Sequence, residues 1–323
     1  MKKIFLSISI MLLLLLLSFE VLTESQSILK SVVFSFSIWK NNIVPSLFPF
    51  FVLSDLLINY GFVELVGELF KPFMYKLFKI NGNSSFAFIM SIISGFPSNS
   101  KYVKELYLKK LINENEASKL LTFTHFSNPL FILGTLSILF LNNKKAGLLI
   151  LFCHYITNII IGIIFRNYYP SDKCNEKVSI KKAIIKMHNK RINNNLNFGQ
   201  IITNSLINSI NTLLLILGIV TMFLCITTII NNNITINNYN QSILNGLFEI
   251  TQGLKYLSVL DATLKFKTVI STMLLSFGGL SVHLQIISIL SDTKIKYIPF
   301  LIARIFHAGI ASLLCFLLFD FFI

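Results

Sequence analysis

Two stretches of the sequence combine glycine with helix-capping polar residues inside apolar surroundings. One is Ser94-Gly95-Phe96-Pro97-Ser98-Asn99-Ser100-Lys101, and the other is Ser276-Phe277-Gly278-Gly279-Leu280-Ser281-Val282-His283. Glycine can end one helix, and serine or asparagine can cap the next. A helix that begins within a membrane offers free N–H groups and partial positive charge, which suit an anion. The predicted chemistry is therefore binding of a small anionic solute, and the alternative is a pair of ordinary loops between helices.

We expect the binding site to consist of these two breaks and the polar or basic residues near them. The predicted substrate-binding residues are Gly95, Pro97, Ser98, Asn99, Ser100, Lys101, Asn128, Gly278, Gly279, Ser281, His283, Gln285, Arg304 and His307. The guanidinium of Arg304 stays protonated and can bind a carboxylate through two parallel hydrogen bonds. The alternative for Arg304 is structural: a salt bridge to Asp55 or Asp320, or a side chain that snorkels to the interface.

No catalytic or metal-binding motif accompanies these residues. The five histidines do not form an H-E-x-x-H motif, and no Walker A sequence is present. The four cysteines have no C-x-x-C spacing, so they predict neither a disulfide framework nor a metal site. The sequence therefore predicts a protein that is not an enzyme, needs no cofactor or metal, and does not pump with ATP.

The composition is that of a membrane protein. Of 323 residues, 54% are hydrophobic and 13% are charged, whereas soluble domains contain about 25% charged residues. We expect an all-α polytopic membrane protein with about eight to ten apolar segments. The net charge of +14 lacks a basic groove or stacking motif, so no nucleic-acid partner is expected. The lipid bilayer is the expected partner.

The predicted domain organisation has four parts. They are an N-terminal membrane anchor at 1–27, a first gate-like half at 28–165, a basic loop at 166–200, and a second gate-like half at 201–323. No small-residue cleavage site follows the first apolar run, so the anchor is expected to stay attached. The positive-inside rule places the basic loop in the cytoplasm.

Each half is expected to contain a re-entrant hairpin, at 84–112 and at 266–290. The apolar arm before each glycine is too short to cross a bilayer, which takes about 20 residues. We expect the tips, near Pro97 and Gly279, to approach each other near the membrane midplane. Asn128-Pro129 should kink a neighbouring span toward these tips, because a polar kink at membrane depth must be buried in protein or line a cavity.

The order of parts indicates an inverted repeat. Gly95 precedes Ser98 by three residues, as Gly278 precedes Ser281. Thirty residues separate Gly95 from His125, and twenty-nine separate Gly278 from His307. Inverted repeats with paired broken segments are typical of secondary transporters. With this topology the lysine pairs 144–145 and 294–296 fall outside the cell, against the positive-inside trend.

Four ordered motifs carry a family resemblance. They are Pro45-Ser46-Leu47-Phe48-Pro49-Phe50, Ser94-Gly95-Phe96-Pro97-Ser98, Ser127-Asn128-Pro129-Leu130-Phe131 and Ser276-Phe277-Gly278-Gly279-Leu280-Ser281-Val282-His283-Leu284-Gln285. Together they resemble the sporulation integral membrane protein family of endospore formers, the YlbJ type. The resemblance implies paired gate, or nucleoside-recognition, domains and an architecture similar to concentrative nucleoside transporters. It also implies movement of dipicolinate across the outer forespore membrane into the developing spore.

Two functional hypotheses remain open at this point. The first is a multi-pass carrier of a small anionic solute, with dipicolinate as the solute implied by the resemblance. A coupling ion and a homo-oligomeric assembly are further candidate partners. The alternative is a non-transporting membrane scaffold of the sporulation envelope, in which the breaks serve only helix packing.

Overall fold

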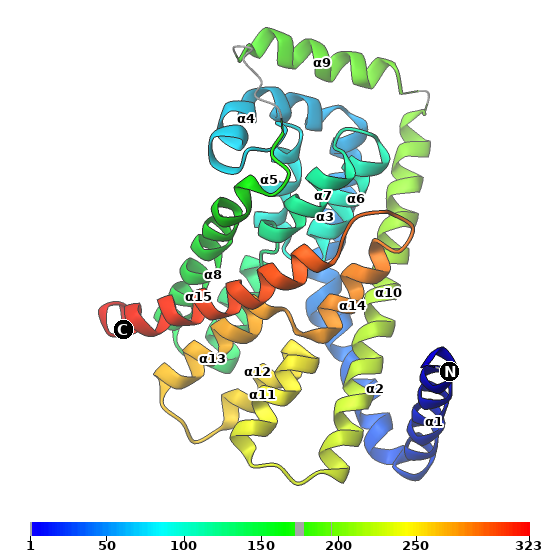
Figure 1. The fold of residues 1–323 in the computed structure, drawn as a ribbon, viewed down its shortest axis with the longest axis vertical. Coiled ribbons are helices and arrows are strands. Elements are labelled where there is room, and N and C mark those ends of the chain that lie inside the picture. The colour runs from blue at the N-terminus through cyan, green and yellow to red at the C-terminus, as the bar shows by residue number, and fades with distance from the viewer. Residues whose placement is uncertain (1, 172–177, 195) are drawn as a thin grey trace.

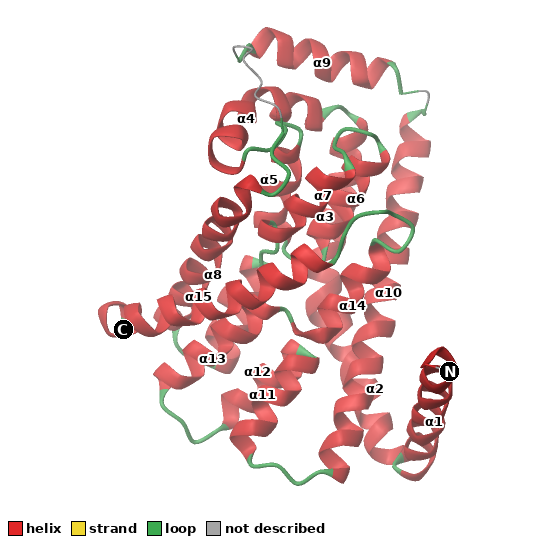
Figure 2. Ribbon diagram, viewed as in Figure 1, coloured by secondary structure: helices red, strands yellow, loops and turns green. Residues whose placement is uncertain are grey.

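The structure is a computed structural model that describes residues 2–171, 178–194 and 196–323. Within these residues it is built from helices and loops, without strands (Figures 1 and 2). The helices are α1 (Lys2–Thr23), α2 (Ser25–Ile38), η1 (Trp39–Ile43), α3 (Val44–Asn59), α4 (Phe62–Phe78), α5 (Ser84–Ser94), α6 (Ser98–Leu108), α7 (Glu114–Phe123), η2 (Phe131–Phe140), α8 (Lys144–Ile164), η3 (Phe165–Asn167), α9 (Ile180–Ile192), α10 (Phe198–Asn233), α11 (Asn238–Phe248), α12 (Ile250–Val259), α13 (Leu264–Phe277), α14 (Gly279–Ile289) and α15 (Ile298–Phe322).

The all-helical polytopic membrane fold is confirmed. Four segments of the described chain are long and apolar enough to cross a membrane: 144–167, 198–233, 264–289 and 298–322. The number rises to six if each of two sharply bent helix pairs counts as one span. One of these pairs joins α3 to α4 with a bend of 85°, so α4 runs across the end of the bundle (Figure 1).

The first hairpin lies where the sequence predicts it. Helices α5 and α6 pack against each other, and the chain reverses at residues 95–97. The Tyr102 hydroxyl on α6 donates to the Ser94 hydroxyl on α5 over 3.0 Å, which ties the two arms together. The next segment consists of α7 and η2, two helices separated by a non-helical stretch around Asn128.

The second hairpin is not at 266–290, so that part of the prediction is wrong. Helices α13 and α14 continue as one 26-residue candidate span that is only broken at Gly278. The second hairpin is instead α11 and α12, which pack closely and reverse at Glu249. A Cβ on Gly253 would clash with the backbone of Gly246, so the two arms touch backbone to backbone.

This assignment moves one of the two lysine pairs, 294–296, away from the outer side, where the positive-inside rule disfavours it. Because 264–289 spans, the loop after it reaches the end of the bundle where α6 ends and α7 begins. Lys104 on α6 pairs with Asp292 at 2.7 Å, and the Lys296 backbone N–H donates to the Ser118 hydroxyl on α7 over 2.9 Å. Lys294 and Lys296 therefore lie on the α6–α7 side rather than at the opposite end of the molecule.

Both halves have the same order of parts once the hairpins are assigned. A long helical segment (α2 through α3, with α4 after it, or α10) precedes a hairpin, a broken pair of helices (α7–η2 or α13–α14) and an uninterrupted helix (α8 or α15). The hairpin α5–α6 opens toward α4 and α9, whereas α11–α12 opens toward the opposite end (Figure 1). The two halves are thus arranged as an inverted repeat.

The basic helix α9 lies outside the repeat and packs on α4. Lys186 of α9 and Lys71 of α4 both pair with the buried Glu68 carboxylate, each at 2.7 Å. Glu68 therefore links α9 to the bundle through two lysines, while Lys181 and Lys182 of α9 are exposed.

Candidate functional site

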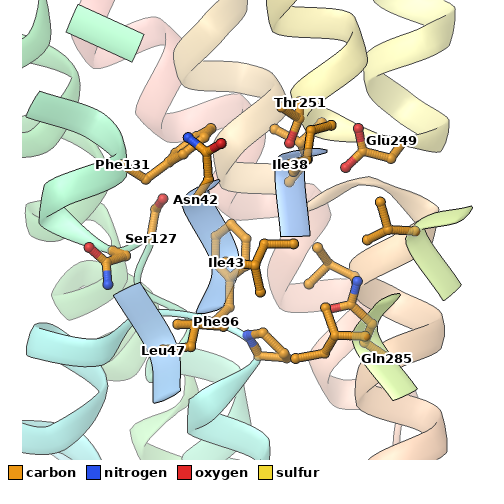
Figure 3. A pocket seen from close by; sticks show the side chains of 16 residues that line it. Ile38, Asn42, Ile43, Leu47, Phe96, Ser127, Phe131, Glu249, Thr251 and Gln285 are labelled. Carbon is orange, nitrogen blue, oxygen red and sulfur yellow. The ribbon is translucent and has the colours of Figure 1, made fainter. Parts of the chain in front are cut away.

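A cavity of about 100 Å³ lies where the two hairpins and the two broken spans meet (Figure 3). The first tip contributes Phe96 and Pro97, and the second contributes Glu249, Ile250 and Thr251. The broken spans contribute polar and apolar side chains on either side. The remaining lining residues are Ile38, Asn42, Ile43, Leu47, Ser127, Asn128, Phe131, Ile216, Val220, Val282 and Gln285.

The first tip is fixed by contacts to the broken span beside it. Gly95 has a φ of 78°, and a Cβ there would clash with the backbone of Asn128. The Phe96 N–H donates to the Phe126 carbonyl over 2.7 Å, and the Asn128 side-chain amide donates to the Ser94 carbonyl over 3.1 Å. The predicted kink therefore faces the hairpin and offers its amide to the hairpin backbone.

The non-helical stretch between α7 and η2 has partners for its backbone groups, as burial at membrane depth requires. Tyr155 of α8 donates to the Ser127 carbonyl over 2.9 Å, and Asn158 donates to the His125 carbonyl over 2.8 Å. The His154 ring accepts the Ser127 N–H over 2.9 Å through Nε2. Helix α8 thus holds the break open, and His154 has the structural role of a hydrogen-bonded histidine.

The second tip places a carboxylate at the start of a half-helix. Glu249 is extended, with φ −139° and ψ 116°, and it caps α12 by accepting the Gln252 N–H at Oε2 over 2.8 Å. Its side chain is buried, and Figure 3 shows it beside Thr251 at the edge of the cavity. This tip contains no proline and no glycine at the turn itself.

The break at Gly278 leaves room for a histidine ring. Gly278 has a φ of 98°, and a Cβ there would lie 2.8 Å from Nε2 of His125. The His125 ring stacks on Phe96 of the first tip, with ring centroids 4.4 Å apart. The first tip and the second broken span therefore contact each other through His125.

A cluster of polar side chains behind the cavity surrounds Arg304, which is fully buried. Its Nη2 donates to the Thr122 carbonyl and, over 3.3 Å, to Asn158 Oδ1. Its Nη1 lies 2.6 Å from His307 Nδ1, and Nε2 of that ring bonds the His154 carbonyl over 2.9 Å. Because Arg304 donates to His307 Nδ1, the His307 ring is neutral with its proton on Nε2.

Comparison with known proteins decides the family. The chain is 31% identical to the sporulation integral membrane protein YlbJ of Bacillus subtilis (strain 168), over 94% of this chain and 80% of that protein. This protein belongs to the YlbJ family of sporulation integral membrane proteins. Residues 42–144 also match the Gate family, described as nucleoside recognition. No solved structure gives a significant match.

The Gate match falls on the first half of the YlbJ-type fold. It begins at Asn42 in η1 and includes the hairpin α5–α6 and the broken span α7–η2. It therefore contains the first tip and the kink at Asn128, but not Glu249 or Gln285. The full-length similarity to the YlbJ relative extends the family assignment to the second half.

Three of the residues predicted to bind substrate line the cavity directly: Pro97, Asn128 and Gln285. Ser98, Asn99 and Ser100 lie in the first turn of α6 and are fully buried. The Ser100 hydroxyl donates to the Pro97 carbonyl over 2.7 Å, whereas the side-chain polar atoms of Ser98 and Asn99 have no protein partner. Gly95 shapes the first tip from behind.

The predicted basic residues lie away from the cavity lining. Lys101 pairs with the buried Asp55 at 3.3 Å and lies over the Phe51 ring at 4.9 Å. The candidate partners of Arg304 are otherwise engaged, since Asp320 pairs with Lys265 at 2.6 Å. The break around Gly278, Gly279, Ser281 and His283 adjoins the cavity through Val282, and His283 bonds the Tyr297 hydroxyl over 2.6 Å.

Glu249 is the charged residue among the lining residues that the predicted site does not include. Its signal was present in the sequence: an acidic residue within a weakly apolar stretch, between Gly246 and Gly253. An acid at membrane depth indicates a functional site by default. Two small residues flanking it at helical distance allow the arms of a hairpin to pack tightly, as the structure shows.

Proposed function

We propose that this protein is a secondary carrier that moves a small anionic solute, dipicolinate, across the outer forespore membrane during sporulation. The observation that carries the proposal is the cavity at the meeting point of two opposed hairpin tips and two broken spans. Paired broken segments in inverted halves surround the substrate site of many carriers. The family membership supports the sporulation context.

The lining supports a small, flat, polar solute. A volume of about 100 Å³ corresponds to about three water molecules at about 30 Å³ each, so a ring-sized solute requires the hairpin tips to move apart as it binds. Phe96 and Phe131 offer aromatic faces, and Asn128 and Gln285 offer amide donors. The side chains therefore suit a flat ring with polar substituents.

Two half-helices begin at the cavity. Helix α6 starts directly after Pro97, and α12 starts directly after Glu249. Each N-terminus carries partial positive charge and N–H groups without intrahelical partners, which favour a carboxylate or another anion. This arrangement supports an anionic solute without a basic side chain in the lining.

The proposed orientation follows the distribution of basic residues. Helix α9 contains Lys181, Lys182, Lys186, Lys190 and Arg191, and it covers the end of the bundle near α4 (Figure 1). The positive-inside rule assigns this end to the cytoplasm. The hairpin α5–α6 then opens to the cytoplasm and α11–α12 to the opposite side, so one hairpin lies on each side of the cavity.

The test is transport by the purified full-length protein in proteoliposomes. Counterflow of labelled dipicolinate should be saturable and absent from protein-free liposomes. Asn128→Leu removes the amide at the cavity and its bond to Ser94, and we expect counterflow to fall at least about tenfold, which is a loss of about 1.4 kcal/mol. The neighbouring Leu130→Ala is the matched control, since Leu130 is 65% exposed and should keep wild-type rates.

Two outcomes would reject the carrier. A folded wild-type protein without counterflow would favour the scaffold hypothesis. Equal counterflow in the wild type and Asn128→Leu would move the solute path away from this cavity.

A further inference from the structure

The carboxylate of Glu249 is the charged group of the cavity, and its burial needs an explanation. The residue is 4% exposed and lies at the tip of α11–α12 among apolar lining side chains such as Ile38, Ile250 and Val282. An ionised carboxylate in such surroundings is costly unless it is paired or neutralised. Its Oε2 accepts the Gln252 N–H at 2.8 Å, and the hydroxyl and backbone N–H of Thr251 also bond the carboxylate, so all of its hydrogen-bond donors are neutral.

No cationic side chain of the described residues pairs with Glu249. Lys255 lies over the Phe34 ring at 4.1 Å, and Lys267 donates to the Ser258 carbonyl over 2.9 Å. The His283 ring is occupied by Tyr297 and the Phe277 carbonyl. The titratable groups on the elements packed around the tip and cavity are Lys30, Lys40, Asp55, Lys101, Tyr102, Lys104, Glu105, Tyr107, His125, Cys225, Tyr239, Lys255, Tyr256, Lys265, Lys267 and His283.

The remaining charged groups of this set are also engaged or remote. Lys265 pairs with Asp320 at 2.6 Å, and Asp55 pairs with Lys101 at 3.3 Å. Lys30 and Lys40 are exposed on α2 and η1. The side chains around Glu249 therefore supply no positive charge that could balance an ionised carboxylate.

We propose that Glu249 carries a coupling proton, so that the solute is moved together with one H⁺. This inference rests on the proposed function and names its driving ion. A carboxylate solute in the cavity would meet the Glu249 carboxylate, and two carboxylates at close range cannot both stay ionised. Solute binding therefore requires a proton on Glu249, which then donates a hydrogen bond to the solute carboxylate.

The proton and the solute enter and leave together. The proton comes from water on the side where the solute binds, and it returns to water on the other side when the solute leaves. No bond other than the carboxyl O–H forms or breaks. A solute of charge −2 thus crosses as a complex of net charge −1, and the vacated carboxylate is again capped by the Gln252 N–H.

The lining favours a proton over a metal ion. One carboxylate oxygen already accepts a backbone N–H, so this carboxylate has few free lone pairs left for a metal ion. No group of three or more His, Cys, Asp or Glu side chains within the described chain could hold a metal ion. A proton needs only the carboxylate itself.

The experiment compares counterflow with gradient-driven uptake for the full-length protein in proteoliposomes. At zero membrane potential, one pH unit, acidic on the side of addition, supports about tenfold accumulation of dipicolinate if one proton accompanies each solute. An internal pH dye should report one proton per solute. Glu249→Gln imitates the protonated acid but cannot release a proton, so any counterflow it catalyses should come without accumulation against the pH gradient.

Matched variants separate coupling from folding. Glu114→Gln removes another acid, which pairs with Lys296 at 3.6 Å far from the cavity, and it should accumulate solute as the wild type does. Glu249→Asp keeps a titratable group and should keep some gradient-driven uptake. Protein-free liposomes measure passive entry of the protonated acid.

The outcomes distinguish the two proposals. Wild-type counterflow with no response to the pH gradient, or gradient-driven accumulation by Glu249→Gln, would overturn the proton site and leave the carrier intact. Absence of wild-type counterflow would overturn both. If Glu249→Gln does not fold, the proton count of the wild type decides, and a count of zero would reject the proposal.

Discussion

The two hairpin tips reach one cavity by different means. The first tip is held by neutral backbone contacts, among them Phe96 N–H to Phe126 at 2.7 Å and the Asn128 amide to Ser94 at 3.1 Å. The second tip has a single acid, Glu249, whose carboxylate caps its own helix. The difference suggests a division of work, in which the first half forms a fixed wall and the second half carries the variable charge.

The largest expected effect comes from breaking the fixed wall. Gly95→Ala places a Cβ against the Asn128 backbone and a side chain at φ 78°, so we expect a loss of stability on the order of 4 kcal/mol. The thermal unfolding midpoint of the purified protein measures it. Gly218→Ala is the matched control, because nothing lies within 4 Å of the added Cβ. Similar midpoints for both variants would show that the first tip is not rigidly held.

An intermediate effect is expected from the cluster behind that wall. Arg304→Lys keeps the charge but cannot satisfy the Thr122 carbonyl, Asn158 and His307 together, since lysine lacks the planar fork. We expect a loss of about 2 kcal/mol in stability, with the KM for solute changed less than twofold in protein that remains folded. A large rise in KM with an unchanged unfolding midpoint would instead return Arg304 to the substrate site.

The smallest effect is expected at the end of the bundle, where the loop after α14 contacts α6. The hydrogen bond from Lys104 lowers the pKa of the exposed Asp292 below its usual value of 3.8. Because the pKa is lowered in the folded state, this small stabilisation is present at neutral pH and is lost as the pH falls below about 4. Asp292→Asn should lower the free energy of unfolding at pH 7 by no more than about 0.5 kcal/mol, and added salt should remove the difference from wild type. A larger, salt-independent shift would show that this contact holds the two halves together.

The first tip could be predicted because its signals are local. Gly95 and Pro97 mark where one helix ends and the next begins, although α6 starts at Ser98 without the predicted side-chain cap. Asn128-Pro129 marks a polar kink that needs a buried partner. The membrane fold follows in the same way from composition. These features depend on neighbouring residues, which the sequence displays directly.

The second hairpin could not be located from local signals. A break such as Gly278-Gly279 can either reverse the chain or merely interrupt a span, and the direction after the break depends on packing with distant helices. The true tip at Glu249 has neither glycine nor proline at its turn. Similarly, the acceptors around Arg304 belong to residues 122, 158 and 307, two of them in other helices, so its structural role appears only in the folded chain.

The central claim is that the solute binds between the two hairpin tips, and site-directed labelling tests it most directly. In a background with Cys153, Cys174, Cys225 and Cys315 replaced by alanine, Thr251→Cys places a thiol in the cavity lining. Val259→Cys, on the same helix α12 and 81% exposed, serves as the control. Dipicolinate should slow labelling of the thiol at 251 several-fold by a membrane-permeant maleimide and leave the thiol at 259 unaffected. Equal labelling rates at 251 with and without saturating solute, in protein that catalyses counterflow, would contradict the account.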